Sequence, residues 1–116
     1  MNDITIPAWH AHIYYDLATT RTIAADLREK IAAGFPSSVI GGWHDRNVGP
    51  HTQPMYQVAF DAALFDTFVP FLALNRAGLA VLVHPHSTGD HVADHMEHAI
   101  WLGEILDINT AQWLDN

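Results

Sequence analysis

The sequence predicts one α+β domain over residues 1–116: a ferredoxin-like βαββαβ antiparallel sheet with an extra C-terminal helix. Two observations lead to this fold class. Short segments rich in branched and aromatic residues alternate with longer segments whose apolar residues recur every three or four positions. The chain also has no linker or repeat, and its 49% hydrophobic and 16% charged residues are typical of a globular domain.

Four strands are predicted, each short and bounded by Pro, Gly, Asp or Asn. They cover residues 9–15, 38–45, 55–61 and 79–86.

Three helices are predicted from apolar periodicity. The first covers residues 22–33, where Ile23, Leu27 and Ile31 form one stripe and a glycine follows as a stop. The second covers residues 62–76, and Pro70 inside it predicts a kink or a late start. The third covers residues 92–103, with Met96, Ala99 and Ile100 facing inward.

This topology leaves one face of the sheet uncovered. The usual strand order 4-1-3-2 places two helices on one face, and the other face must be covered or solvated. A chain of 116 residues with one added helix covers it only in part. We therefore expect a homodimer, either with two sheets packed face to face or as a closed dimeric α+β barrel.

Composition excludes several classes of partner. The net charge of −8, from 13 acidic and 5 scattered basic residues, makes nucleic acid an unsuitable ligand. No apolar run is long enough to span a membrane. The chain has no cysteine and begins without a signal-peptide pattern, so we expect a cytoplasmic protein.

Histidine is over-represented, with nine residues in the chain. His10 and His12 are spaced i, i+2 on the first strand, so they share a face with Tyr14, and His84 and His86 repeat this spacing on the fourth strand. If the fourth strand lies antiparallel beside the first, the two pairs meet at one end of the sheet. Four neighbouring imidazoles suit a divalent transition metal.

His51 lies in a loop shaped by Gly and Pro. Simple strand geometry puts this loop at the opposite end of the first strand from His10. Three interpretations stay open: it reaches a metal near His12, it completes a site across a dimer, or it is a surface histidine.

Further candidates lie in or just before the last predicted helix and at the end of the second one. His95 and His98 are spaced i, i+3, which suits a role in proton transfer or substrate contact. Asp90 and Asp94 could ligate a metal, or could cap the helix. Arg76 either clamps a substrate carboxylate or balances the dipole of the helix that it ends.

Other chemistries lack their motifs. Residues 94–98 read DHMEH, which departs from the His-Glu-x-x-His pattern of zinc proteases. There is also no Gly-x-Gly-x-x-Gly, Walker A or Gly-x-Ser-x-Gly pattern.

An ordered set of segments resembles the DOPA 4,5-dioxygenase family of fungi and bacteria. The resemblance covers residues 9 to about 109. Its segments are WHAHIYY (9–15), GPH (49–51), MYQVAF (55–60), LNRAGL (74–79), VLVHP (81–85), DH (94–95) and AIWLG (99–103).

The resemblance implies a non-haem Fe(II) enzyme that cleaves the ring of DOPA or a related catechol with O2 in the extradiol manner. Another divalent metal such as zinc can occupy such a site in a purified sample. By position, the implied metal ligands are the histidines of the first strand, the loop and the fourth strand: His10, His12, His51 and His84. His95 and His98 are the candidate catalytic acid–bases, and Arg76, Tyr14 and His86 the candidate substrate contacts.

Two other functions fit the same fold. One is a non-catalytic dimer that binds Zn²⁺, Ni²⁺ or a small ligand without consuming O2. The other is a metal-free dimeric-barrel monooxygenase or isomerase with a histidine base. The physiological substrate and the position of ring cleavage stay open.

Overall fold

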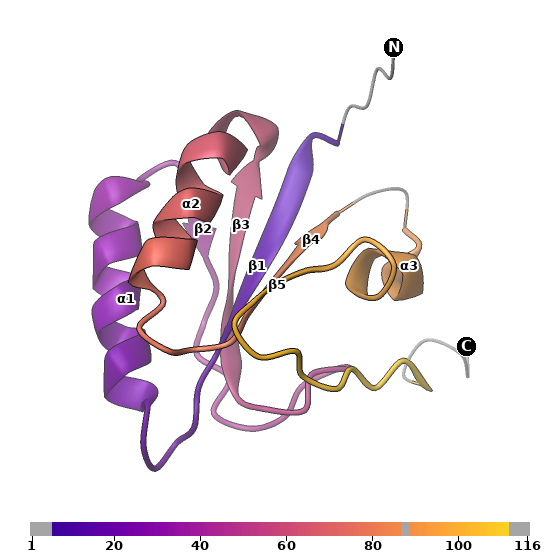
Figure 1. Ribbon diagram of the computed structural model, residues 1–116, viewed down its shortest axis with the longest axis horizontal. Coiled ribbons are helices and arrows are strands. Elements are labelled where there is room, and N and C mark those ends of the chain that lie inside the picture. Colours follow the sequence, from indigo (N-terminus) through magenta and orange to yellow (C-terminus); the bar gives the residue numbers. More distant parts are fainter. Residues whose placement is uncertain (1–5, 87–88, 112–116) are drawn as a thin grey trace.

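The computed structural model describes residues 6–86 and 89–111 (Figure 1). Its centre is a five-stranded antiparallel sheet in the order β2-β3-β1-β4-β5. The strands are β1 (Ala8–Tyr14), β2 (Val39–Ile40), β3 (Met55–Asp61), β4 (Val81–Pro85) and β5 (Ile100–Leu102). The helices are α1 (Arg21–Gly34), the 3-10 turn η1 (Ala62–Leu64), α2 (Phe65–Asn75) and α3 (His91–His95).

The first four strands confirm the predicted strand order. β1 is central, with β3 on one side and β4 on the other, and β2 pairs with the outer edge of β3. Read from β4, the order is 4-1-3-2. The expected neighbours of the first strand are therefore present, which the predicted histidine cluster requires.

Helices α1 and α2 cover one face of the sheet, as expected (Figure 1). The predicted stripe of α1 points inward, since Leu27 is 2% exposed and Ile31 is fully buried. These side chains pack on Ala11 and Ile13, the β1 residues that alternate with the histidines. The hydrophobic core and the histidines thus occupy opposite faces of one strand.

The second helix shows the late start that its proline predicts. Residues 62–64 form the 3-10 turn η1, and the α-helix begins at Phe65 and keeps Pro70 inside it. Phe68 and Leu72 are its fully buried residues, one turn apart.

The third predicted helix is wrong over most of its length. It ends at His95, and Ile100, Trp101 and Leu102 instead form β5, which pairs antiparallel with β4. Without β5, the outer edge of β4 would have unpaired backbone groups, and a branched-aromatic-branched triplet suits a strand. Edge pairing therefore outweighs the weak helical periodicity of this segment.

The second predicted strand is much shorter than expected. β2 has two residues, and the next bridge to β3 is an isolated one between His44 and Met55. The intervening Gly41 donates its backbone N–H to the Gln57 carbonyl at 2.7 Å. A Cβ on Gly41 would lie 3.3 Å from that carbonyl oxygen, so glycine permits this close approach.

The C-terminal segment covers part of the second face of the sheet. Trp101, Leu106 and Ile108 pack on a small cluster that includes Tyr14 and Leu82. Part of the face that we expected a second copy to cover is therefore covered within the chain. No helix in the described parts of the chain is long and apolar enough to cross a bilayer.

Candidate metal centre

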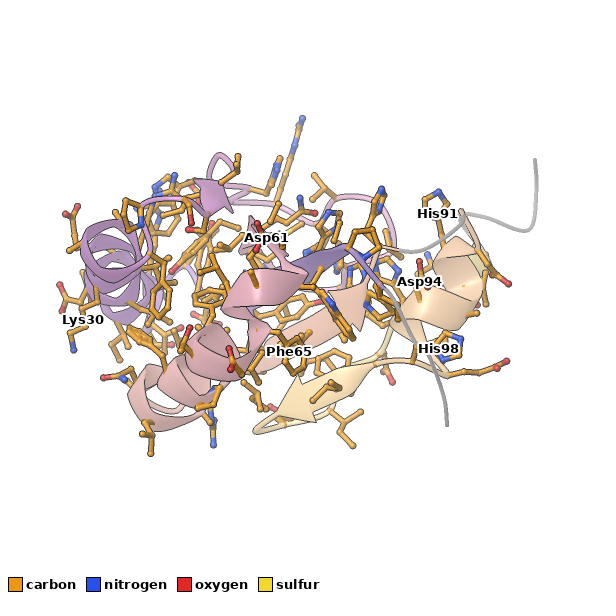
Figure 2. The ribbon with its side chains drawn as sticks, turned by 90° about the horizontal axis from the view of Figure 1, so that it is seen from above. Lys30, Asp61, Phe65, His91, Asp94 and His98 are labelled. Atoms are coloured by element: carbon orange, nitrogen blue, oxygen red, sulfur yellow. The ribbon has the colours of Figure 1, made fainter. Side chains whose placement is uncertain are left out.

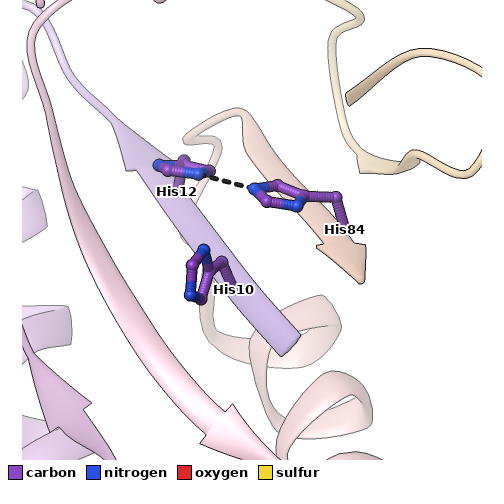
Figure 3. Close-up of side chains that lie close together, drawn as sticks. All are labelled: His10, His12 and His84. Carbon is purple, nitrogen blue, oxygen red and sulfur yellow. Dashed lines mark hydrogen bonds between the residues drawn. The ribbon is translucent and has the colours of Figure 1, made fainter. Parts of the chain in front are cut away.

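Strands β1 and β4 bring three histidines together on the face opposite α1 and α2 (Figure 3). His10 and His84 are directly opposite in the antiparallel register, and His12 lies two residues along β1. The Nε2 atoms of His12 and His84 are 2.9 Å apart. The predicted meeting of the first and fourth strands at their histidines is confirmed.

Two further imidazoles join from outside the sheet. The loop that precedes β3 places the His51 ring 4.2 Å from the His12 ring, measured between centroids. Helix α3 places the His95 ring 3.9 Å from the His84 ring. The loop therefore brings His51 to His12 within one chain, and its role as a metal ligand stays a prediction.

The five histidines form two overlapping sets of possible ligand atoms. One set is His10, His12 and His84, and the other is His12, His51 and His95. Within each set, one nitrogen from each ring lies within 4.8 Å of the others. His12 belongs to both sets, so it is the centre of the cluster.

Outer hydrogen bonds set the orientation of two of these rings. The Nδ1–H of His84 donates to the Pro85 carbonyl, and that of His95 donates to the His91 carbonyl, each at 2.8 Å. A carbonyl can only accept, so Nδ1 must carry the proton in both rings. In a neutral imidazole the lone pair is then on Nε2, the nitrogen that can bind a metal.

The surroundings keep the cluster uncharged at neutral pH. Burial, and then the charges of neighbouring histidines, lower the pKa of His10 and His51 to about 4 and that of His84 to about 3. The same causes lower the pKa of His12 well below its usual value, and burial lowers that of His95. Neutral imidazole is the form that ligates metals.

His12 provides the test of whether these residues fit a metal. It is 3% exposed, and its Nδ1 is buried without a hydrogen-bond partner. Its Nε2 faces the Nε2 of His84, and at most one proton can lie between those two nitrogens. A cation could bind the lone pairs of both converging Nε2 atoms at once. The donor set fits a transition metal, although imidazole alone does not distinguish iron from zinc, nickel or copper.

Two of the predicted substrate contacts lie beside the cluster. His86 is exposed just beyond β4, and its ring stacks on His10 at 4.7 Å between centroids. Tyr14 is only 1% exposed, and its hydroxyl contacts Nδ1 of His51 at 2.6 Å. His86 is therefore accessible to a ligand, whereas Tyr14 is buried and contacts His51.

Two other predicted residues lie outside the cluster. His98 is exposed in the turn after α3, and Figure 2 shows it on the side of the sheet away from Lys30 of α1. Arg76 ends α2 and donates to the Leu79 carbonyl at 3.0 Å, at the opposite end of β4 from His84. The structure does not bring either residue to the five histidines.

The carboxylates near α3 differ in role. Asp90 caps the helix, since its Oδ1 accepts from the Ala93 backbone N–H at 3.0 Å. Asp94 is 2% exposed, and its negative charge acts to raise the pKa of His84 and His10. In the described part of the chain, neither belongs to the two ligand sets.

Sequence reasoning missed that His95 is placed among the possible metal ligands. The spacing of His95 and His98 predicted a role in proton transfer or substrate contact instead. The position of α3 depends on how the chain turns back after β4, which no local pattern encodes. The contact between Tyr14 and His51 was also missed, although the shared face of Tyr14 and His12 was a usable signal.

The fold and the site define a small α+β domain with a buried histidine cluster that is compatible with transition-metal binding. The chain belongs to the Dopa 4,5-dioxygenase family, whose family model matches residues 9–112. The predicted family resemblance is confirmed.

Two curated fungal proteins are similar to this chain. The chain is 28% identical over 116 residues to a DOPA 4,5-dioxygenase of Amanita muscaria, covering 94% of this chain and 50% of that protein. It is 33% identical over 111 residues to an uncharacterized 21.2 kDa protein of Botryotinia fuckeliana, covering 88% and 61%. The chain thus spans half to three-fifths of the length of these curated relatives.

A solved structure has the same fold. A crystal structure from Nostoc punctiforme, described as that of a candidate dioxygenase, has a TM-score of 0.91 and 45% identity. The match covers 99% of this chain and 97% of that one. The family model and the titles of two of these relatives carry the word dioxygenase.

Proposed function

We propose that the protein is a non-haem Fe(II)-dependent dioxygenase that cleaves the ring of DOPA or a related catechol in the extradiol manner. The observation that carries the proposal is the buried cluster of neutral imidazoles around His12, in a chain that belongs to a dioxygenase family. When bound, Fe(II) would acidify the catechol hydroxyl groups and couple oxidation of the ring to reduction of O2.

The ligands in this proposal are the four predicted histidines, His10, His12, His51 and His84. They come from β1, β4 and the loop before β3, so a rigid sheet fixes three of them. The hydrogen bond from His84 to Pro85 presets the ring before a metal binds.

Proton transfer is assigned to the histidines of the last helical region. The Nε2 atom of His95 lies among the cluster, and its Nδ1–H is held by the His91 carbonyl. It would take the catechol proton and later return it to the ring-opened product. His98 is exposed and would exchange protons with solvent.

The carboxylate of an amino-acid substrate needs a cation on this acidic protein. Arg76 is the predicted clamp, but its guanidinium is hydrogen-bonded at the far end of β4. Arg46 is a second candidate, since it lines a cavity of about 510 Å³ with Trp43 and His44. Kinetics of Arg46→Gln and Arg76→Gln distinguish the two candidates. The variant that loses the carboxylate clamp should have a raised KM for DOPA and an unchanged KM for unsubstituted catechol.

The test is anaerobic reconstitution with Fe(II), followed by O2 uptake and visible absorbance with DOPA and a panel of catechols. A yellow product formed with matching loss of O2 supports the proposal. No uptake by fully iron-loaded protein would favour a metal-binding module without catalysis.

Variants connect this activity to the cluster. His12→Ala and His84→Ala should each abolish stoichiometric iron binding and turnover, because each removes a buried ligand from the centre of the site. His98→Ala is the matched control for iron content, since it removes an exposed histidine outside both ligand sets. Full iron content and activity in His12→Ala would contradict the assignment.

A further inference from the structure

The Tyr14 hydroxyl contacts His51, one of the proposed metal ligands, at a single ring nitrogen. Its hydroxyl lies 2.6 Å from Nδ1 of His51, and both side chains are buried, at 1% and 6% exposed. A hydroxyl can donate or accept, so this contact alone permits two tautomers of His51. The tautomer with the proton on Nδ1 leaves the Nε2 lone pair for a metal.

The Tyr14 ring is itself held in place. It stacks on Trp101 of β5, with ring centroids 5.9 Å apart and an interplanar angle of 22°. Its backbone N–H donates to the Ala80 carbonyl at 3.0 Å. Burial raises the pKa of its hydroxyl, so Tyr14 stays neutral and keeps its hydrogen-bonding proton.

The backbone of His51 is fixed as well. Its N–H donates to the Val48 carbonyl, and an isolated bridge joins it to Ile108. The preceding Pro50 carbonyl accepts from the Asn109 N–H at 2.8 Å. With backbone and position fixed, the ring orientation is the remaining freedom of this residue, and Tyr14 is the partner at Nδ1.

We propose that Tyr14 is a positioning residue, which accepts from Nδ1–H of His51 and so holds its Nε2 ready for the metal. It acts on His51 as the Pro85 and His91 carbonyls act on His84 and His95. The inference rests on the metal site of the proposed function, but not on ring cleavage or on the substrate. The sequence predicted Tyr14 as a substrate contact. The positioning role suits its side chain better, because that side chain is only 1% exposed.

The test compares Tyr14→Phe with Tyr15→Phe. Each variant removes one hydroxyl from a tyrosine that is 1% exposed, but Tyr15 donates to Asp45 on the other face of β1. Zn(II) and Co(II) titrations of the purified protein measure affinity without turnover. We expect Tyr14→Phe to bind each metal roughly 10- to 100-fold more weakly, as for other outer partners of ligating histidines, and Tyr15→Phe to match the wild type.

A second measurement reports the tautomer itself. ¹⁵N NMR of Zn(II)-loaded wild-type protein should show His51 protonated at Nδ1 and metal-bound at Nε2. In metal-free Tyr14→Phe, the His51 signals should move toward a mixture of tautomers, a change that general destabilisation of the fold would not produce.

The outcomes separate this inference from the proposed function. Unchanged affinity in Tyr14→Phe, or a metal-bound Nδ1 in the wild type, overturns the role of Tyr14. Wild-type protein that binds neither Zn(II) nor Co(II) overturns this role together with the metal site. Metal binding of the expected kind without O2 uptake overturns only the dioxygenase activity. If Tyr14→Phe does not fold, the NMR measurement on the wild type decides alone.

Discussion

His95 can use its Nε2 atom in one of two ways, as a metal ligand or as a proton acceptor. His95 belongs to one of the two ligand sets and is also an expected proton-transfer group, so the geometry allows either role. The two roles differ in one measurable respect, because a ligand is needed for metal binding and an acid–base is not.

We expect His95→Gln to keep stoichiometric iron and to lose roughly 10²- to 10⁴-fold in kcat, the usual contribution of a positioned acid–base. Iron content by mass spectrometry and O2 uptake check this. His98→Gln is the comparison for iron content, since the same change is made at an exposed position outside both ligand sets. Loss of iron in His95→Gln would instead make His95 a ligand.

At the residue scale, the sequence could predict the cluster only as far as strand periodicity allows. His10, His12 and His84 were placed correctly because alternation along a strand and antiparallel pairing are regular. His51 could not be placed from its own loop. It reaches His12 because the C-terminal segment pairs with that loop at Ile108, a contact that joins distant parts of the chain.

At the scale of elements, the two faces of β1 have different roles: one belongs to the hydrophobic core and the other carries histidines of the candidate metal centre. Its odd-numbered residues, such as Ala11 and Ile13, belong to the core with α1 and α2, and its even-numbered histidines face the other way. A change in the core should therefore affect stability without changing the composition of the site.

Leu27→Ala on α1 tests this separation. Leu27 is 2% exposed, so we expect the free energy of unfolding to fall by about 2–5 kcal/mol, with unchanged zinc stoichiometry in the folded protein. Urea denaturation measures the loss. Leu17→Ala is the matched control at a position that is 53% exposed, and its effect should stay within about 0.5 kcal/mol. Loss of zinc binding in folded Leu27→Ala would show that the two faces are coupled.

The elements that were predicted best are those with strong local periodicity. The apolar stripe of α1 and the alternation in β3 and β4 are properties of their own residues. β5 could not be predicted, because residues 100–102 become a strand only when the edge of β4 is beside them. Likewise, the sequence around Gly41 and Gly42 did not predict that β2 would end before the isolated bridge at His44.

At the scale of the whole molecule, five imidazoles with lowered pKa values make stability depend on pH. Below about pH 6.5 the unfolded chain binds protons at these histidines that the folded chain does not bind. The stability of the metal-free protein should therefore be fully present above that pH. It should fall between about pH 6.5 and pH 4, by up to about 1.4 kcal/mol per pH unit for each of His51 and His84.

Urea denaturation at a series of pH values measures this dependence. Zinc-loaded protein is the comparison, because a metal holds the histidines in their neutral form and should delay the loss to lower pH. A free energy of unfolding that stays constant from pH 7 to pH 4.5 in the metal-free protein would contradict the neutral cluster.

The expected homodimer also belongs to this scale and stays a prediction. The C-terminal segment covers part of the second sheet face through Trp101 and Ile108, which reduces the area that a partner would need to cover. Sedimentation equilibrium of the metal-free and zinc-loaded protein measures the oligomeric state directly.

In the proposed reaction, both atoms of O2 enter the product when a catechol ring opens at the histidine cluster. The most direct measurement is mass spectrometry of the product formed from DOPA under ¹⁸O2 by iron-loaded protein, with borohydride added at once to prevent exchange of the aldehyde oxygen with water. We predict that both labelled atoms enter the ring-opened product in the wild type, and that His12→Ala forms none. Incorporation of a single labelled atom, or an unopened ring from fully iron-loaded wild-type protein, would contradict the proposed dioxygenase activity.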